Sequence, residues 1–333
     1  MDMTVTAGET NLTPINGSDQ AFHQYYTELL ILQLLTGIVA LVGLAGNVVV
    51  LWLLGFRMRR NSFSVYILNL AGADFLFLCY RFIHSLVLVF DFDFVNEVIN
   101  RFLSPVSIFA YISGLSFLSA ISTERCISVL WPIWYRCRRP RHLSAIICAL
   151  LWALSLLLSM LEGNYCGFFS LDEPNVGFHV WCPMLDFISA AWLILLFVLL
   201  SGSSLALVTR LLCGSHRLPP TRLYLTVMIT VLVFLLCGLP FGIYWFLIVW
   251  FPNEFNALFH VFLMVVLLSC INSCANPIVY FFVGSFRQRW WKGRHTLRLV
   301  LQRALQDTPE VDEPGESLPG ETLAMSGSSL GQG

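Results

Sequence analysis

The run HLSAIICALLWALSLLLSMLEG, residues 142–163, contains no Asp, Glu, Lys or Arg before Glu162 near its end. A helix that crosses the hydrocarbon core of a membrane needs about 20 mostly apolar residues, and its own hydrogen bonds satisfy the backbone in lipid. This run is long and apolar enough. Together with this run, the chain contains seven such spans, at residues 29–56, 62–90, 99–130, 142–163, 185–213, 222–250 and 256–283. The expected fold class is all-α, a seven-transmembrane helix bundle.

The composition of the whole chain agrees with a membrane protein. Of 333 residues, 57% are hydrophobic and 12% are charged, whereas a soluble domain is about 45–50% apolar and about 25% charged. So small a share of charged residues cannot keep the surface of a globular protein hydrated, which excludes an ordinary cytosolic enzyme. The net charge of −1 argues against a nucleic-acid partner.

The basic residues predict the orientation of the spans. Sixteen of the 19 Lys and Arg residues fall in alternate loops or in the C-terminal tail, and such segments face the cytoplasm. With seven spans, the N-terminus is then outside. Two glycosylation acceptors, Asn11 and Asn16, agree with that placement. We expect a multi-pass protein of the plasma membrane with an extracellular N-terminus.

Four regions follow from these patterns. Residues 1–28 form an extracellular glycosylated N-terminus and 29–283 the seven-transmembrane domain. Basic and apolar residues then alternate at helical spacing, which predicts an amphipathic cytoplasmic helix on the membrane surface over 284–305. Acidic, Gly and Ser residues predict a disordered cytoplasmic tail over 306–333.

Polar residues inside the spans are the next candidates, because lipid penalises ionisable groups. Asp74 lies in the middle of the second span, and Asn47, Asn272 and Asn276 lie at similar depth in the first and seventh. Two interpretations stay open for this polar hub. It is a hydrogen-bonded cluster that joins helices, or its carboxylate binds a cation or proton and biases the packing.

Several motifs together carry a family resemblance. Asn47, the Leu-Ala-x-Ala-Asp run ending at Asp74, Glu124-Arg125-Cys126, Pro240 and Asn276-Pro277-Ile278-Val279-Tyr280 follow one another at consistent depths. In this order they resemble a rhodopsin-like (class A) G protein-coupled receptor. Trp131-Pro132-Ile133-Trp134-Tyr135 and Leu239-Pro240-Phe241-Gly242 are similar to the Mas-related receptors, especially the X subfamily. The likeness covers residues 40–310.

The resemblance implies a receptor and gives several residues a role in activation. Its partners would be a heterotrimeric G protein (Gq and/or Gi), arrestin, receptor kinases and membrane lipids, in itch, pain or mast-cell activation. Glu124 replaces the usual Asp and can pair with Arg125, and Gly114 stands where sodium-binding receptors carry a hydroxyl. The residues implied in G-protein coupling and activation are Glu124, Arg125, Cys126, Pro240, Asn276, Pro277 and Tyr280.

Two of the ten cysteines, Cys166 and Cys182, fall near the expected outer face, where thiols oxidise. Most class A receptors tether the outer end of the third helix, but the third span begins here without a cysteine. We therefore expect a Cys166–Cys182 bridge between the fourth and fifth spans. The alternative is two free thiols.

Acidic residues gather on the expected outer side, where 12 of the 20 Asp and Glu lie and only Arg81 and Arg101 oppose them. Such a charge attracts cations, although it also suits a solvated surface. Glu162 and Asp186 stand out because the bridge would bring their helix ends together. In the X subfamily, acids at these positions engage basic peptides and cationic amphiphiles. Phe168, Trp181 and Trp245 are candidate aromatic contacts, or else membrane-interface anchors.

The predicted function is therefore a cell-surface receptor for a basic peptide or cationic small-molecule agonist. The alternatives are a class A receptor for a lipid or neutral ligand, and a membrane transporter, although the spans lack repeats and a line of midplane charges. We expect no enzyme activity, because the chain has no catalytic motif of the hydrolase or metalloprotease kind. No cofactor and no metal is expected.

Overall fold

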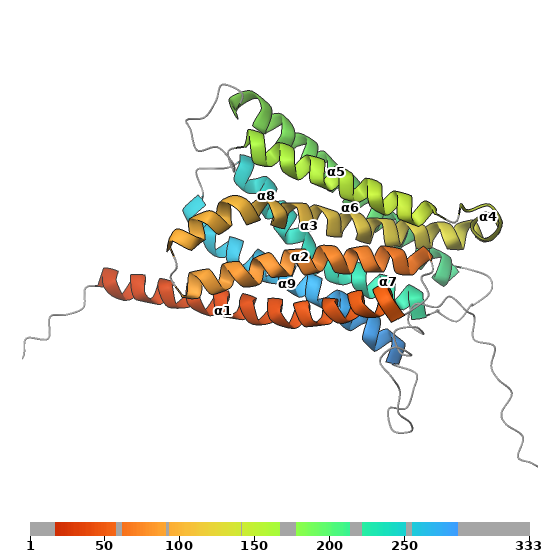
Figure 1. Ribbon diagram of the computed structural model, residues 1–333, viewed down its shortest axis with the longest axis horizontal. Coiled ribbons are helices and arrows are strands. Elements are labelled where there is room, and N and C mark those ends of the chain that lie inside the picture. Colours follow the sequence, from red (N-terminus) through yellow and green to blue (C-terminus); the bar gives the residue numbers. More distant parts are fainter. Residues whose placement is uncertain are drawn as a thin grey trace, which may run out of the picture.

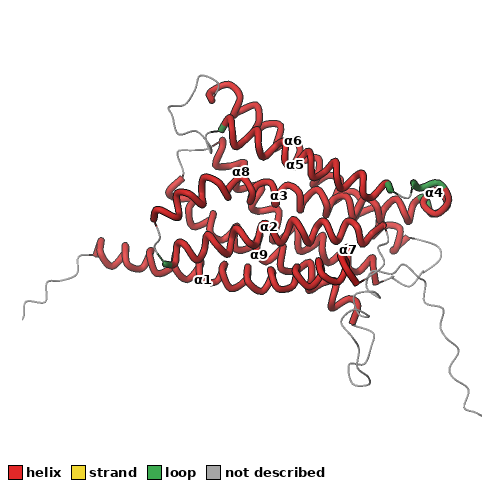
Figure 2. The backbone as a smooth tube through the Cα atoms, viewed as in Figure 1, coloured by secondary structure: helices red, strands yellow, loops and turns green. Residues whose placement is uncertain are grey.

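The computed structural model describes residues 17–57, 62–90, 93–140, 142–166, 178–213, 222–250 and 255–285. Their regular elements are all helices (Figures 1 and 2). In chain order these are α1 Gly17–Trp52, the π-helical η1 Leu53–Arg57, α2 Ser62–Val89, α3 Asp93–Leu130, α4 Pro132–Cys137, α5 Leu143–Tyr165, α6 Phe178–Cys213, α7 Arg222–Val233, the π-helical η2 Phe234–Gly238, α8 Leu239–Trp250 and α9 Phe255–Ser285. The predicted all-α fold is confirmed.

The long helices lie side by side as one bundle (Figure 1). Helix α2 packs between α1 and α3, α3 contacts both α5 and α6, and α9 closes against α1 and α8. Six of the described helices are long and apolar enough to cross a membrane. The remaining span, sixth in chain order, is α7, η2 and α8 taken together, and its apolar part runs from Met228 to Tyr244. Helix α4 is a short turn in the loop that joins α3 to α5.

Helix α3 occupies the middle of the bundle. In the most apolar window of Leu103–Leu130, 72% of the residues are buried, against 22% for Trp181–Leu207 in α6. Small side chains make this central position possible, because they let neighbouring helices approach closely. Ser122 of α3 bonds the hydroxyls of Ser203 and Ser204 of α6 at 2.7 and 3.0 Å. Large apolar side chains instead cover the outside, as expected for a lipid-facing surface.

Several helix ends differ from the predicted span ends. Helix α1 begins at Gly17, so residues 17–28 of the predicted N-terminal region are helical, and α6 begins at Phe178 and includes Pro183. Hydropathy marks only the part of a helix that crosses lipid, whereas the backbone bonds continue into polar sequence. The acceptors Asn11 and Asn16, and the predicted helix and tail beyond Ser285, lie outside the described residues.

Candidate functional site

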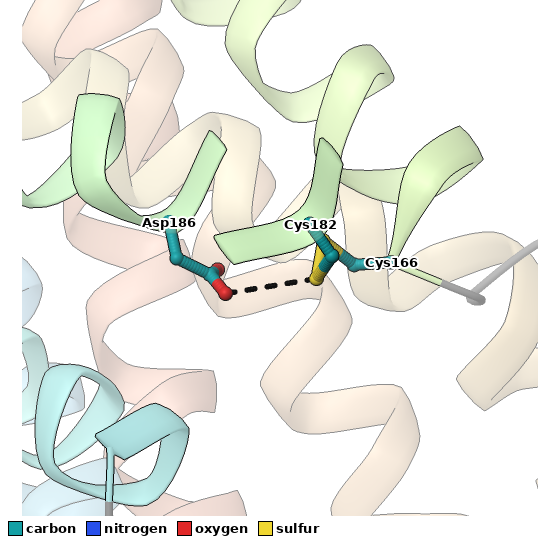
Figure 3. A group of neighbouring side chains, drawn as sticks. All are labelled: Cys166, Cys182 and Asp186. Carbon is teal, nitrogen blue, oxygen red and sulfur yellow. Dashed lines mark hydrogen bonds between the residues drawn. A yellow bond between two sulfur atoms is a disulfide. The ribbon is translucent and has the colours of Figure 1, made fainter. Parts of the chain in front are cut away.

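A disulfide joins the C-terminal end of α5 to the N-terminal part of α6, which confirms the expected Cys166–Cys182 bridge (Figure 3). Cys166 caps the C-terminal end of α5, and Cys182 lies near the start of α6, with the two Cα atoms 5.0 Å apart. The bridge ties the connecting loop to its own two helices rather than to α3. It also fixes the relative position of the acidic residues that lie one turn away on each helix.

Asp186 lies one turn after Cys182, so its half-buried carboxylate points toward the disulfide (Figure 3). Its Oδ2 is 3.6 Å from Cys182 Sγ, the approach drawn as a dashed line. A sulfur in a disulfide has no proton to donate, so this contact leaves the carboxylate able to accept other hydrogen bonds. The bonded sulfurs likewise cannot serve as thiolate ligands, so these three residues do not form a metal site.

Glu162 lies one turn before the disulfide, on α5, and its backbone carbonyl accepts a hydrogen bond of 2.8 Å from the N–H of Cys166. The side chain is only 3% exposed. Neither carboxylate oxygen has a hydrogen-bond partner in the described part of the chain. Ser189 and Asp186 approach from α6, although Ser189 forms no hydrogen bond of ordinary geometry. The bridge thus brings the two predicted acids close together. We call the region around Glu162, Asp186 and the disulfide the mouth.

The three predicted aromatic contacts have different outcomes. Trp181 precedes Cys182, is 53% exposed, and packs at a tilt against Tyr165 of α5, with ring centroids 6.2 Å apart. It therefore borders the mouth. Phe168 lies outside the described residues, and Trp245 belongs to α8, but its side chain is not among those described. Ligand contact by all three stays a prediction.

The polar hub forms a set of hydrogen bonds in the interior. The Asn276 amide donates to Asp74 Oδ2 at 2.7 Å, which joins α9 to α2. The Asn47 amide donates to the carbonyl of Ser273 at 3.2 Å, which joins α1 to α9. A Cβ added to Gly114 would lie 3.9 Å from Asp74 Oδ1, so α3 faces this carboxylate without offering a hydroxyl there. Asn272 is also buried.

The inner end of α3 is held by the loop that follows it. Glu124 forms an ion pair with Arg139 and accepts a 2.9 Å hydrogen bond from the Tyr135 hydroxyl of α4. Burial, and then the charge of Glu124, raise the pKa of Tyr135 to about 12, so this hydroxyl stays protonated and donates. Arg139 also donates to Ser62 at 2.6 Å and to Ser144 at 2.5 Å, which links α2, α3 and α5.

Arg125, the partner expected for Glu124, is buried with its guanidinium 3.6 Å from the centre of the Phe63 ring of α2. Cys126 is buried beside it. Pro240 lies just after η2, and Pro277 lies inside α9. Tyr280 belongs to α9, but its side chain is not among those described.

Comparison with known proteins identifies the family. Residues 46–280 match the family described as 7 transmembrane receptor (rhodopsin family). The Mas-related G-protein coupled receptor member X2 of Rhinopithecus bieti is 60% identical over 99% of this chain and 100% of the relative. Member X2 of Homo sapiens is 59% identical over the same shares, and member X1 of Homo sapiens is 59% identical over 100% of both chains. The chain belongs to the Mas-related G protein-coupled receptors.

The receptor is thus a multi-pass membrane protein and not an enzyme, in agreement with the sequence-based expectation. As a member of this family it connects a ligand to G proteins. Sequence reasoning found the acids, the cysteines and the hub, but it did not single out Arg139 as the partner of Glu124. The only signal was the position of Arg139 in a basic inner loop, and that signal did not distinguish it from its neighbours.

Proposed function

We propose that this chain is a cell-surface receptor for basic peptides and cationic amphiphilic small molecules. It sits in the plasma membrane with its N-terminus outside and signals through Gq and/or Gi proteins in itch, pain or mast-cell activation. The observation that carries the proposal is the carboxylate of Glu162, which is buried without a partner in the described part of the chain, at the mouth that also holds Asp186.

The electrostatics of this mouth favour a cation. A carboxylate taken out of water is costly unless an opposite charge or hydrogen-bond donors accompany it. The nearby carboxylate of Asp186 adds repulsion to that cost. A guanidinium or ammonium group from a ligand would offset both, and a guanidinium can bond a carboxylate through two parallel N–H groups. Exposed aromatic faces such as Trp181 suit the same cations.

The position of the disulfide supports a peptide or amphiphile as the ligand. The disulfide holds the ends of α5 and α6 to each other and makes no covalent tie to α3. Residues 167–177 contain no cysteine, so no disulfide can link them to α3. A mouth of this kind admits ligands of varied length that share a cation, so we expect several agonists rather than one.

On the inner side, Arg125, Tyr280 and the basic loop after α3 would receive the G protein. The regular α-helix of the sixth membrane span is interrupted where the π-helical η2 meets Pro240, because π turns and prolines change the regular backbone bonds of a helix. Outward movement of α7 about this point would open the cavity for the G protein, as in other two-state helical switches. Arrestin and receptor kinases would then act on the same inner face.

The decisive variants are Glu162→Gln and Asp186→Asn, with Glu28→Gln as the control because Glu28 is an exposed acid at the outer end of α1. Removing one partner of a buried interfacial charge pair costs about 2–5 kcal/mol, roughly 30-fold or more in potency. Calcium release in cells challenged with Arg- and Lys-rich peptides measures the effect. Both site variants should lose potency while Glu28→Gln keeps it, at equal surface expression. Unchanged potency in both site variants would contradict the proposal.

A further inference from the structure

Helix α2 carries a second buried charge toward the outer half of the bundle. Arg81 lies two turns before the end of α2 at Val89 and is only 6% exposed. Its guanidinium carbon lies 5.2, 5.0 and 5.3 Å from the ring centres of Phe77, Tyr80 and Phe241. Three aromatic side chains from α2 and α8 therefore surround the cation.

No anion accompanies this guanidinium in the described part of the chain. The buried Nε of Arg81 has no hydrogen-bond acceptor in the described part of the chain, and the other group that approaches the guanidinium there is the thiol of Cys270 in α9. Contacts with aromatic faces attract a cation, but they recover only a small part of the cost of removing a guanidinium from water. The arrangement is therefore incomplete without a negatively charged group.

The position of Arg81 complements that of the two acids. Phe241 of α8 packs against Tyr111 of α3, with ring centroids 4.8 Å apart, so Arg81 borders a region between α2, α3 and α8. Glu162 and Asp186 belong to α5 and α6. Helix α3 packs against α2, which carries Arg81, and also against α5 and α6, which carry the acids (Figure 1).

We propose that Arg81 is an anion subsite that binds a carboxylate of the ligand, while Glu162 and Asp186 bind its cation. This inference rests on the proposed function for the cationic end. A guanidinium suits this task because its planar N–H groups match the two oxygens of a carboxylate. The preferred agonists are then basic peptides or amphiphiles that also carry one carboxylate, set apart from the positive groups.

The test uses pairs of Arg- and Lys-rich peptides with amidated C-termini. The two peptides of a pair differ at one position, which holds Glu in one peptide and Gln in the other. Successive pairs place this position at different points along the peptide, and one further peptide carries a free C-terminal carboxylate. Potency of calcium release is measured for wild type, Arg81→Gln and Arg81→Lys. At one position, Glu should raise potency about tenfold over Gln on wild type. Arg81→Gln should lose that gain and answer the Gln peptides as wild type does.

Arg81→Lys serves as the second variant, because it keeps the charge but loses the planar N–H groups. Arg81→Lys should retain only part of the increase in potency that Glu gives over Gln. If Arg81→Gln fails to reach the cell surface, Arg81→Lys still tests the anion subsite. Equal potency of Glu and Gln forms at every position on wild type would overturn the anion subsite alone. An equal loss of both forms in Arg81→Gln would also overturn it. Gln peptides that are inactive on wild type would overturn the proposed function and this inference together.

Discussion

Gly238 illustrates at the scale of single residues how tightly the interior of the receptor is packed. A Cβ placed on it would lie 2.6 Å from Cδ2 of Phe234 and 3.1 Å from Nδ2 of Asn272. The Tyr111 hydroxyl of α3 donates to its carbonyl at 3.0 Å, which satisfies a backbone acceptor at the end of η2. A larger side chain has no room at this position unless Phe234 or Asn272 moves.

Gly238→Ala tests this packing. The added methyl group must displace the Phe234 ring or Asn272, which should lower the free energy of unfolding by about 1–3 kcal/mol. Gly202→Ala is the matched control, because a Cβ there meets nothing within 4 Å and alanine favours a helix. Thermal melting of the purified receptor compares the two. If Gly238→Ala melts at or above the temperature of Gly202→Ala, the close packing described around Gly238 is wrong.

The chemistry of individual residues was largely predictable from the sequence, whereas their partners were not. Asp74, Glu162 and Asp186 stand out because acids are rare within or beside apolar runs. The Tyr111 bond to Gly238 spans 127 positions, and no local pattern encodes such a contact. Arg125, the neighbour of Glu124 in sequence, was the expected partner, and the Glu124–Arg139 ion pair that the structure shows was not foreseen.

At the scale of elements, α4 and the residues after it hold the C-terminal end of α3 against α2 and α5. Arg139 contacts Glu124 of α3, Ser62 of α2 and Ser144 of α5, and so joins three helices through one guanidinium. Its ion pair with Glu124 is almost fully buried, with both side chains 6–7% exposed. Buried pairs of this kind respond strongly to the loss of one partner.

Arg139→Gln should therefore destabilise the inner face. Glu124 would remain buried without the guanidinium of Arg139, although it would keep the hydrogen bond from the Tyr135 hydroxyl. The expected loss is about 3–5 kcal/mol. Arg138→Gln is the neighbouring control, since Arg138 is exposed. Melting temperatures of the two purified variants provide the comparison. Equal melting temperatures would show that the Glu124–Arg139 pair does not stabilise the receptor.

The spans themselves were predictable because each needs a long apolar run, and all seven are found. Their ends were not, since polar residues such as those after Gly17 continue a helix without any hydropathy signal. The disulfide between α5 and α6 was predictable because Cys166 and Cys182 alone fall near the outer ends of spans.

At the scale of the whole molecule, polar and charged side chains occupy different levels along the helix bundle. Buried serines and the Asp74–Asn276 bond occupy the middle. One end of the bundle holds Glu162 and Asp186, and the other end holds Arg125 and Arg139. The acidic pair and the buried arginines therefore lie at opposite ends of the bundle.

The most direct test of this account uses purified receptor in lipid nanodiscs with a purified heterotrimeric G protein. Nucleotide exchange on the G protein is measured with and without an Arg- and Lys-rich peptide, for wild type and for the Glu162→Gln/Asp186→Asn double variant. The peptide is expected to accelerate nucleotide exchange with the wild-type receptor and to have little effect with the double variant. Equal acceleration by both proteins, or peptide-driven solute movement across liposomes without any G protein, would contradict it.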